Sequence, residues 1–262
     1  RAMLKRPESA STYRVRDVAP TTLVLGNIGA LAPSPDGSLA AMWRHVFAPN
    51  QRDHAFALLG EVYRPLYLNQ APIMYTERRT AELIKYAANA FLATKITFIN
   101  EMADLCEQVG ANVQEVARGI GLDKRIGAKF LHAGPGFGGS CFPKDLAALV
   151  QTGERVGYPF QIAGAAAKVN YEQHLRMVQK VKDACGGVKG KTLGVLGLSF
   201  KPNTNDMREA PSLTILSELM KEGATIRAYD PASMEESMKL LPGMVPCQET
   251  YDVGDGADGL II

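Results

Sequence analysis

Residues 192–229 decide the fold. They open with Thr192-Leu193-Gly194-Val195-Leu196 and close with Ala224-Thr225-Ile226-Arg227-Ala228-Tyr229. Both runs are short and apolar, which predicts two strands. Between them, residues 212–221 carry apolar side chains three and four positions apart, which predicts an amphipathic helix. Two strands joined through a helix are typical of a parallel, doubly wound α/β sheet, because parallel neighbours need a long crossover connection.

The alternation of helix and strand continues to the last residue. A helix is expected over 234–240, and Gly259-Leu260-Ile261-Ile262 is typical of the start of a buried strand. A domain rarely stops there, and the chain opens on Arg1-Ala2-Met3, so we expect a fragment truncated at both ends. The α/β domain is assigned to residues 186–262.

The longest signal is a stretch without glycine or proline over residues 81–109. A helix that is apolar nearly all round must be covered on several sides, and a second subunit is a plausible cover. Further helices are expected near 113–118, 144–156 and 162–184. We therefore predict an all-helical central domain over residues 76–185, which dimerises through its long helix.

Residues 1–75 form an N-terminal remnant, in which residues 1–52 are assigned no function and a helical part follows. Strands are expected over 21–26 and 39–43, joined by a tight turn, and they could form a hairpin or one propeller-like blade. One blade cannot bury its own faces, and the sequence contains no internal repeat. A helix is expected over 54–63 and a short extended segment over 72–76.

The composition limits the classes of function. The 262 residues are 46% hydrophobic and 21% charged, which is typical of a globular protein of about two domains. A net charge of +2 gives no signal for binding to nucleic acid or to a membrane surface. No apolar run is long enough to cross a bilayer. The cysteines form no CxxC pair and no cluster with histidine, which predicts no metal site and favours a reducing cytoplasm.

The strongest chemical motif is a glycine-rich loop that begins at Phe130 and ends at Cys141. Four glycines within residues 134–139 allow the backbone to approach a ligand closely. Pro143 suits the first turn of a helix, where unpaired N–H groups favour a thiolate at Cys141. Asp145 lies one turn later and could deprotonate a water molecule. A buried cysteine in a turn is the alternative, but the glycines, the helix start and the acid together favour a catalytic nucleophile.

A second candidate pair lies on the long helix. Lys85 and Asn89 are one turn apart and so share a face. Both can donate hydrogen bonds to a developing oxyanion. The alternative is a lysine that extends to solvent beside an asparagine satisfied elsewhere.

A third candidate is the segment Gly194–Pro202. A strand followed by glycines opens many dinucleotide-binding folds, but this segment lacks the G-x-G-x-x-G pattern. Lys201 and Arg208 could meet phosphates, and Phe200 could stack on a base. An α/β turn with solvated charges is the alternative. Asp230 ends the second strand, where an acid can bind a ribose but is also common for other reasons.

Taken in order, these motifs resemble the UDP-glucose/GDP-mannose dehydrogenase family over residues 53–262. The resemblance is carried by Ala81–Lys95, Arg125–Gly127, Gly139–Asp145, Gly197–Pro202 and Asp206–Glu209. Within the family, Phe142–Asp145 is more similar to members acting on UDP-glucose than to those acting on GDP-mannose or N-acetylhexosamines.

The resemblance implies oxidation of UDP-glucose to UDP-glucuronate with NAD⁺. Cys141 would form a thiohemiacetal and then a thioester, Asp145 would help to activate water, and Lys85 and Asn89 would stabilise the oxyanions. The fold implied is a helical dimerisation domain followed by a Rossmann-like domain in a cytoplasmic homodimer that serves polysaccharide synthesis.

The resemblance also implies binding roles for further residues. Glucose and diphosphate would be held by the loop residues Phe130, Leu131, Gly134, Gly136 and Gly138. Arg125 would reach across the dimer interface, Phe200 and Lys201 would contact UDP, and Arg208 would lie near the dinucleotide phosphates.

One departure from the family changes the expectation. Family members carry an N-terminal Rossmann domain with G-x-G-x-x-G, whereas this chain has no such motif and residues 1–52 do not align. We therefore expect the chain alone to be inactive. Two alternatives stay open: a noncatalytic module for UDP-sugar binding and dimerisation, and a related nucleotide-sugar dehydrogenase.

Overall fold

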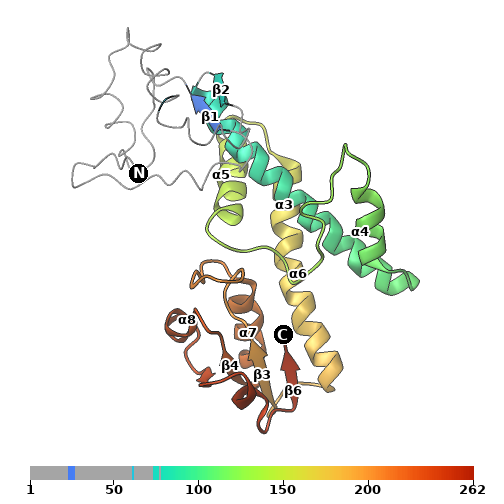
Figure 1. The fold of residues 1–262 in the computed structure, drawn as a ribbon, viewed down its shortest axis with the longest axis vertical. Helices are drawn as coiled ribbons and strands as arrows, with labels where there is room; N and C mark the ends of the chain where they lie inside the picture. Colours follow the sequence, from blue (N-terminus) through green and yellow to red (C-terminus); the bar gives the residue numbers. More distant parts are fainter. Residues whose placement is uncertain (1–22, 27–60, 62–72, 77) are drawn as a thin grey trace, which may run out of the picture. The chain divides into compact units, whose positions relative to one another are not determined.

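The computed structural model describes residues 23–26, 61, 73–76 and 78–262 (Figure 1). The chain divides into two compact units, residues 1–88 and 89–262. The strand expected over 39–43 lies outside the described residues, and so does the helix expected over 54–63 apart from Glu61, which is helical. The predicted domain boundaries at 75/76 and 185/186 stay predictions.

The first unit contains a pair of parallel strands. Strand β1 (Leu23–Gly26) confirms the strand expected over 21–26, and β2 (Ile73–Thr76) confirms the extended segment over 72–76. Leu23 lies opposite Ile73, and the register runs in parallel to Gly26 opposite Thr76. The described partner of β1 is therefore distant in sequence, as a parallel pair requires.

Helix α3 (Arg78–Val109) passes from the first unit into the second and confirms the long helix. It starts three residues before the predicted start at 81. The next helix, α4 (Val113–Gly121), begins where Asn112 Oδ1 accepts a hydrogen bond from the backbone N–H of Gln114 at 2.9 Å. This side chain satisfies one of the backbone donors that every helix start leaves unpaired.

Helices α5 (Phe142–Arg155) and α6 (Gln161–Cys185) complete the helical part and confirm the two remaining predicted helices. Within the second unit α6 lies beside α3. Thr97 donates to the carbonyl of Ala166, and Arg176 pairs with Asp104 at 2.5 Å. The paired positions rise together along both helices, so α3 and α6 run in the same direction.

The sheet of the second unit has the order β5-β4-β3-β6, and all pairs are parallel. Its strands are β3 (Thr192–Leu196), β4 (Thr225–Tyr229), β5 (Val245–Pro246) and β6 (Gly259–Ile261), with helices α7 (Pro211–Lys221) and α8 (Met234–Leu240) between them. The predicted parallel α/β fold is confirmed. Strand β5 and the short 3-10 helix η4 (Tyr251–Gly254) were not predicted, because so few residues give no periodicity.

The core of this domain unites the sheet with two helices. Leu193 of β3, Ile226 of β4 and Leu219 of α7 are fully buried, and Val178 of α6 joins the same cluster. Figure 1 shows α6 extending from the helical part to the sheet. A Cβ atom at Gly194 would lie 2.6 Å from the carbonyl oxygen of Val253, so only glycine fits there. Helix α6 is therefore shared by the helical part and the sheet.

Candidate active site

Cys141 is the N-cap residue of α5, with Pro143 in the first turn, as predicted. The backbone N–H of Asp145 donates to the Cys141 carbonyl at 2.9 Å, which places the two residues one turn apart. The half-buried Cys141 Sγ lies 3.8 Å from Ser140 Oγ. A helix start leaves backbone N–H groups unpaired and carries a partial positive charge, and Cys141 lies at this end of α5.

The Asp145 carboxylate is buried, with an exposed fraction of 1%, and is held at both oxygens. Asn89 Nδ2 donates to Oδ2 at 2.5 Å, and Lys144 Nζ lies 2.7 Å from Oδ1. A buried carboxylate requires such donors, because burial of an unpaired charge is costly. The structure thus brings Asn89 to Asp145, and it adds Lys144, which the sequence analysis quoted within the motif but did not assign.

Lys85 lies one turn before Asn89 on α3 and is half-buried. It belongs to the first compact unit, whereas Asn89 begins the second. Its placement against Cys141 therefore stays a prediction.

Buried amide side chains hold the first half of the glycine loop. Gly134 N–H donates to Asn100 Oδ1 of α3 at 2.8 Å, and Gln173 Nε2 of α6 donates to the Gly134 carbonyl at 2.9 Å. Asn170 of α6 accepts from the Phe137 N–H at 2.7 Å and donates to the Phe137 carbonyl at 3.0 Å. The sequence analysis missed all three amide residues.

The second half of the loop packs against the segment that follows β3. A Cβ atom at Gly138 would lie 2.0 Å from the Glu209 carbonyl oxygen, and one at Gly139 would lie 2.7 Å from the Phe200 ring. The Gly139 N–H donates to the Arg208 carbonyl at 2.9 Å. Gly138 is required because a Cβ atom would meet the backbone of Glu209, and Gly139 because its φ of 81° is in the left-handed region.

Two aromatic rings lie against Phe142, the residue after Cys141. The Phe142 ring meets that of Phe137 at a centroid distance of 5.7 Å and that of Phe130 at 6.2 Å, both edge to face. Phe130 adopts a left-handed backbone with φ of 64°, and Leu131 beside it is buried. Predicted loop residues and the start of α5 thus meet in one place.

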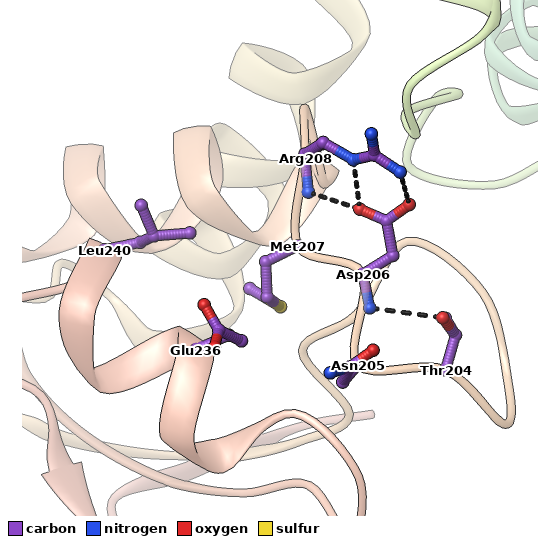
Figure 2. Close-up of a pocket in the computed structure, with 7 residues that line it drawn as sticks. All are labelled: Thr204, Asn205, Asp206, Met207, Arg208, Glu236 and Leu240. Atoms are coloured by element: carbon purple, nitrogen blue, oxygen red, sulfur yellow. Dashed lines mark hydrogen bonds and ion pairs between the residues drawn. The ribbon is translucent and has the colours of Figure 1, made fainter. Parts of the chain in front are cut away.

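A hollow of about 480 Å³ lies between the segment after β3 and α8. Figure 2 shows its lining, which consists of Thr204, Asn205, Asp206, Met207, Arg208, Glu236 and Leu240. Arg208 forms a two-point pair with Asp206, through Nε at 2.8 Å and Nη2 at 2.7 Å. The hydrogen bond from Arg208 lowers the pKa of Asp206. Nearby, Lys201 Nζ lies 5.1 Å from the centre of the Phe200 ring, within range of a cation–π contact.

Asp230 braces the turn after β3 from within. Its Oδ2 accepts from the backbone N–H groups of Leu198 at 2.8 Å and Ser199 at 3.3 Å, and Oδ1 accepts from Ala232 and Ser233. Burial by itself would raise the pKa of Asp230, but the four backbone hydrogen bonds together lower it. This carboxylate is therefore committed to the fold of its own domain.

The exposed Arg125 side chain forms an ion pair within its own loop. Its guanidinium pairs with Asp123 at 2.6 Å. Lys95 of α3 fixes the same loop, because its Nζ donates to the carbonyls of Ile126 at 2.9 Å and Gly127 at 3.1 Å. The predicted reach of Arg125 across a dimer interface stays a prediction.

The described residues contain neither a metal-binding cluster nor a membrane-spanning helix. Their histidine, cysteine and carboxylate side chains form no cluster of three or more that could hold a metal ion. None of their helices is both long enough and apolar enough to cross a membrane.

Two family models match the chain. The model described as the UDP-glucose/GDP-mannose dehydrogenase family, central domain, matches residues 79–172, and that of the UDP binding domain of the same family matches residues 194–262. The UDP-glucose 6-dehydrogenase of Rhizobium meliloti is 55% identical over 206 residues, which cover 78% of this chain and 47% of that protein. UDP-glucose 6-dehydrogenase TuaD of Bacillus subtilis is 52% identical over 209 residues, or 79% of this chain and 45% of that one.

A solved structure agrees with the sequence relatives. A UDP-glucose dehydrogenase from the hyperthermophilic archaeon Pyrobaculum islandicum matches with a TM-score of 0.75 and 38% identity, covering 79% of this chain and 48% of the other. The chain thus spans about half the length of the relatives it matches.

Proposed function

The chain belongs to the UDP-glucose/GDP-mannose dehydrogenase family, as its motifs predicted, and from this premise we propose that it carries the thiol chemistry and UDP-sugar binding of a UDP-glucose 6-dehydrogenase. The observation that carries the proposal is the placement of Cys141 at a helix start, one turn from the buried Asp145. The names of the 55% and 52% identical relatives support UDP-glucose as the substrate.

Cys141 is the proposed nucleophile. Once C6 of the sugar is an aldehyde, the thiolate attacks its carbonyl carbon, an S–C bond forms, and the carbonyl electrons move to oxygen. Asn89 is proposed to stabilise this oxyanion together with Lys85, because an amide nitrogen carries a second N–H besides the one directed at Asp145.

Asp145 is proposed to act in the hydrolysis of the thioester. Water adds to the thioester carbonyl, Asp145 accepts one of its protons, and the C–S bond breaks to release the carboxylic acid and the Cys141 thiolate. The acid then loses its remaining proton to solvent and becomes the carboxylate. Asn89 and Lys144 hold the Asp145 carboxylate in position for this step.

We propose NAD⁺ as the cofactor, which would supply the oxidation needed between these two steps. The turn after β3 does not fit the phosphates of NAD⁺ at Leu198 and Ser199, because the backbone N–H groups of both residues donate to Asp230. Arg208, the residue assigned to the cofactor, would have to share its guanidinium with Asp206. We therefore assign no hydride step to this chain and expect it to bind NAD⁺ weakly, which calorimetry would measure.

The sugar nucleotide is proposed to lie along the glycine loop. Phe130, Leu131, Gly134, Gly136 and Gly138 would face glucose and diphosphate. Phe200 and Lys201 would contact UDP, since Phe200 packs against Gly139 near the end of the same loop and Lys201 Nζ lies 5.1 Å from the centre of the Phe200 ring.

A homodimer through α3 is proposed on the apolar surface of that helix. Phe91, Phe98 and Leu105 follow one another at intervals of seven residues and are 66%, 49% and 52% exposed. Such spacing forms a stripe on one side of a helix, and the same stripe of a second copy would cover it. A cytoplasmic location is proposed from the free cysteines.

The test is the alkylation rate of Cys141 with iodoacetamide between pH 5 and 9, read for each cysteine by peptide mass. We expect Cys141 to react faster than Cys106, Cys185 and Cys247, and UDP-glucose to protect it. Binding of UDP-glucose without fast alkylation of Cys141 would favour the alternative, a noncatalytic UDP-sugar-binding and dimerisation module. Protection by another nucleotide sugar alone would favour a related dehydrogenase.

A further inference from the structure

Helix α6 directs a row of polar side chains at the glycine loop. Gln173 and His174 follow Asn170 by three and four residues, so both are its neighbours on the same side of the helix. Their exposed fractions are only 8%, 6% and 7%. Polar side chains are costly to bury unless each meets a partner, so this row needs an explanation beyond helix packing.

Asn170 supplies the strongest link in this row. Its side-chain amide accepts from the Phe137 N–H at 2.7 Å and donates to the Phe137 carbonyl at 3.0 Å, in the pattern of two paired strands. Two bonds from one planar group fix both the position and the orientation of the backbone. Gln173 adds a third bond, to the Gly134 carbonyl at 2.9 Å.

His174 lies beside Asn170 against the same glycine loop. A Cβ atom at Gly136 would lie 2.7 Å from His174 Nε2 and 2.8 Å from Asn170 Oδ1, so the loop lies directly on both side chains. The loop cannot move toward α6 at this point, and the hydrogen bonds of Asn170 prevent it from moving away.

The loop is also anchored on its other side, close to the nucleophile. Gly139 donates to the Arg208 carbonyl at 2.9 Å, and Gly138 leaves no room between its backbone and Glu209. Of the hydrogen bonds described between α6 and the loop, those at Phe137 lie nearest to Cys141 in the sequence. The residues that follow, Gly138 and Gly139, pack against the α/β domain.

We propose that Asn170 is a positioning residue, assisted by Gln173, which fixes the sugar-binding loop relative to Cys141. This inference rests on the proposed function, because it assumes that the loop faces the sugar. Asn170 itself is assigned no contact with substrate. It acts by setting the backbone of Phe137, and with it the geometry of the loop between the two domains.

The experiment compares two ligands on the chain as it stands. In Asn170→Ala, we expect the affinity for UDP-glucose to fall about tenfold, because two net hydrogen bonds to the loop are lost. The affinity for UDP, which keeps the diphosphate but lacks the sugar, should fall by a clearly smaller factor. Protection of Cys141 from iodoacetamide by UDP-glucose should be lost in parallel. Calorimetry measures the affinities, and peptide mass measures the alkylation.

Gln179→Leu is the matched control. Gln179 is an exposed amide on the same helix, and it donates only to Asp183, one turn away, at 2.7 Å. This variant should keep both affinities. If Asn170→Ala does not fold, Gln173→Leu removes a single bond to the loop, and we expect it to weaken UDP-glucose binding about threefold.

The outcomes separate the two proposals. If the wild-type chain neither binds UDP-glucose nor protects Cys141, the proposed function fails and this inference with it. If the wild type does both, but a folded Asn170→Ala variant keeps its UDP-glucose affinity, the positioning role alone is wrong. An equal loss of UDP and UDP-glucose affinity would also overturn it, since general damage to the fold would then explain the effect.

Discussion

The glycine-rich loop before α5 and the glycine-containing turn after β3 are held in different ways. The loop over 134–139 is fixed by neutral amides from α3 and α6, whereas the turn over 197–199 is fixed by the Asp230 carboxylate. A carboxylate that accepts from the backbone N–H groups of a turn occupies the place where a phosphate would bind. Neutral amides add no charge beside a ligand.

The difference separates two kinds of loop that glycine content alone does not distinguish. The turn after β3 is closed to a phosphate at its backbone, so UDP would have to be met by side chains such as Lys201. The loop before Cys141 is held by neutral amides on its α6 side, so these contacts bring no charge to the loop.

The largest expected effect is at Gly138. Gly138→Ala places a Cβ atom 2.0 Å from a backbone oxygen, so the backbone must shift, and we expect a loss of about 4 kcal/mol in the free energy of unfolding. Gly197→Ala is the matched variant in the other turn. Its φ is 88° with no neighbour within 4 Å, so only backbone strain of about 1–2 kcal/mol is expected. Urea unfolding measures both, and equal losses would contradict the difference in packing.

Asp230 provides the next effect. Asp230→Asn keeps the shape but removes the charge and turns an N–H₂ group toward backbone donors. We expect a loss of about 2–3 kcal/mol, since hydrogen bonds to a charged group are involved. The exposed Asp258→Asn variant, which keeps its carbonyl oxygen near the Thr192 N–H, is the control and should lose less than about 1 kcal/mol. A loss at Asp230 no larger than at Asp258 would argue against the brace.

The two turns should also differ in their response to pH. Burial lowers the pKa of His174 from its ordinary value of 6.5, so the unfolded chain takes up a proton before the folded one. Stability is therefore lost as pH falls below about 6.5. The pKa of Asp230 is lowered from 3.8, so its contribution is present above that value and is lost only as pH falls through the lower folded value.

A comparison of wild type with His174→Gln tests this assignment. The difference in urea midpoint between them should narrow or reverse between pH 7.5 and 5, because only the wild type carries the histidine. A difference that stays constant over this range would show that folding does not lower the pKa of His174.

The smallest effect is expected at Lys201. The segment after β3 would contact UDP through side chains such as Lys201, and not through the backbone of the turn over 197–199. Lys201→Met should therefore weaken UDP binding by about 1 kcal/mol, or roughly fivefold. Lys239→Met, on α8 beside Glu235 and Glu236, is the control and should leave the affinity unchanged. Equal affinities of both variants and the wild type would remove Lys201 from the proposed site.

The sequence predicted the features that depend on nearby residues. The helices α3, α5 and α6 and the strands β3 and β4 follow from periodic apolar positions. The approach of Asp145 to Cys141 follows from one turn of helix. Strand β5 was missed because two residues carry no pattern. The family resemblance came from short motifs and from their order along the chain, and both can be read from the sequence.

Only the tertiary structure revealed what holds the glycine loop. Asn170 and Phe137 are 33 residues apart, and Gln173 and Gly134 are 39 apart, so no local pattern links them. On a helix, an amide that faces a loop has the same spacing as one that faces water. Likewise, the commitment of Asp230 to the turn after β3 depends on how β3 and β4 lie side by side. By itself, the sequence determined which elements form and where the thiol sits, because those follow from neighbours within a helical turn or a strand. The tertiary structure decided which polar groups are consumed by the fold and which remain for a ligand, because hydrogen-bond partners distant in sequence are chosen only when the chain packs.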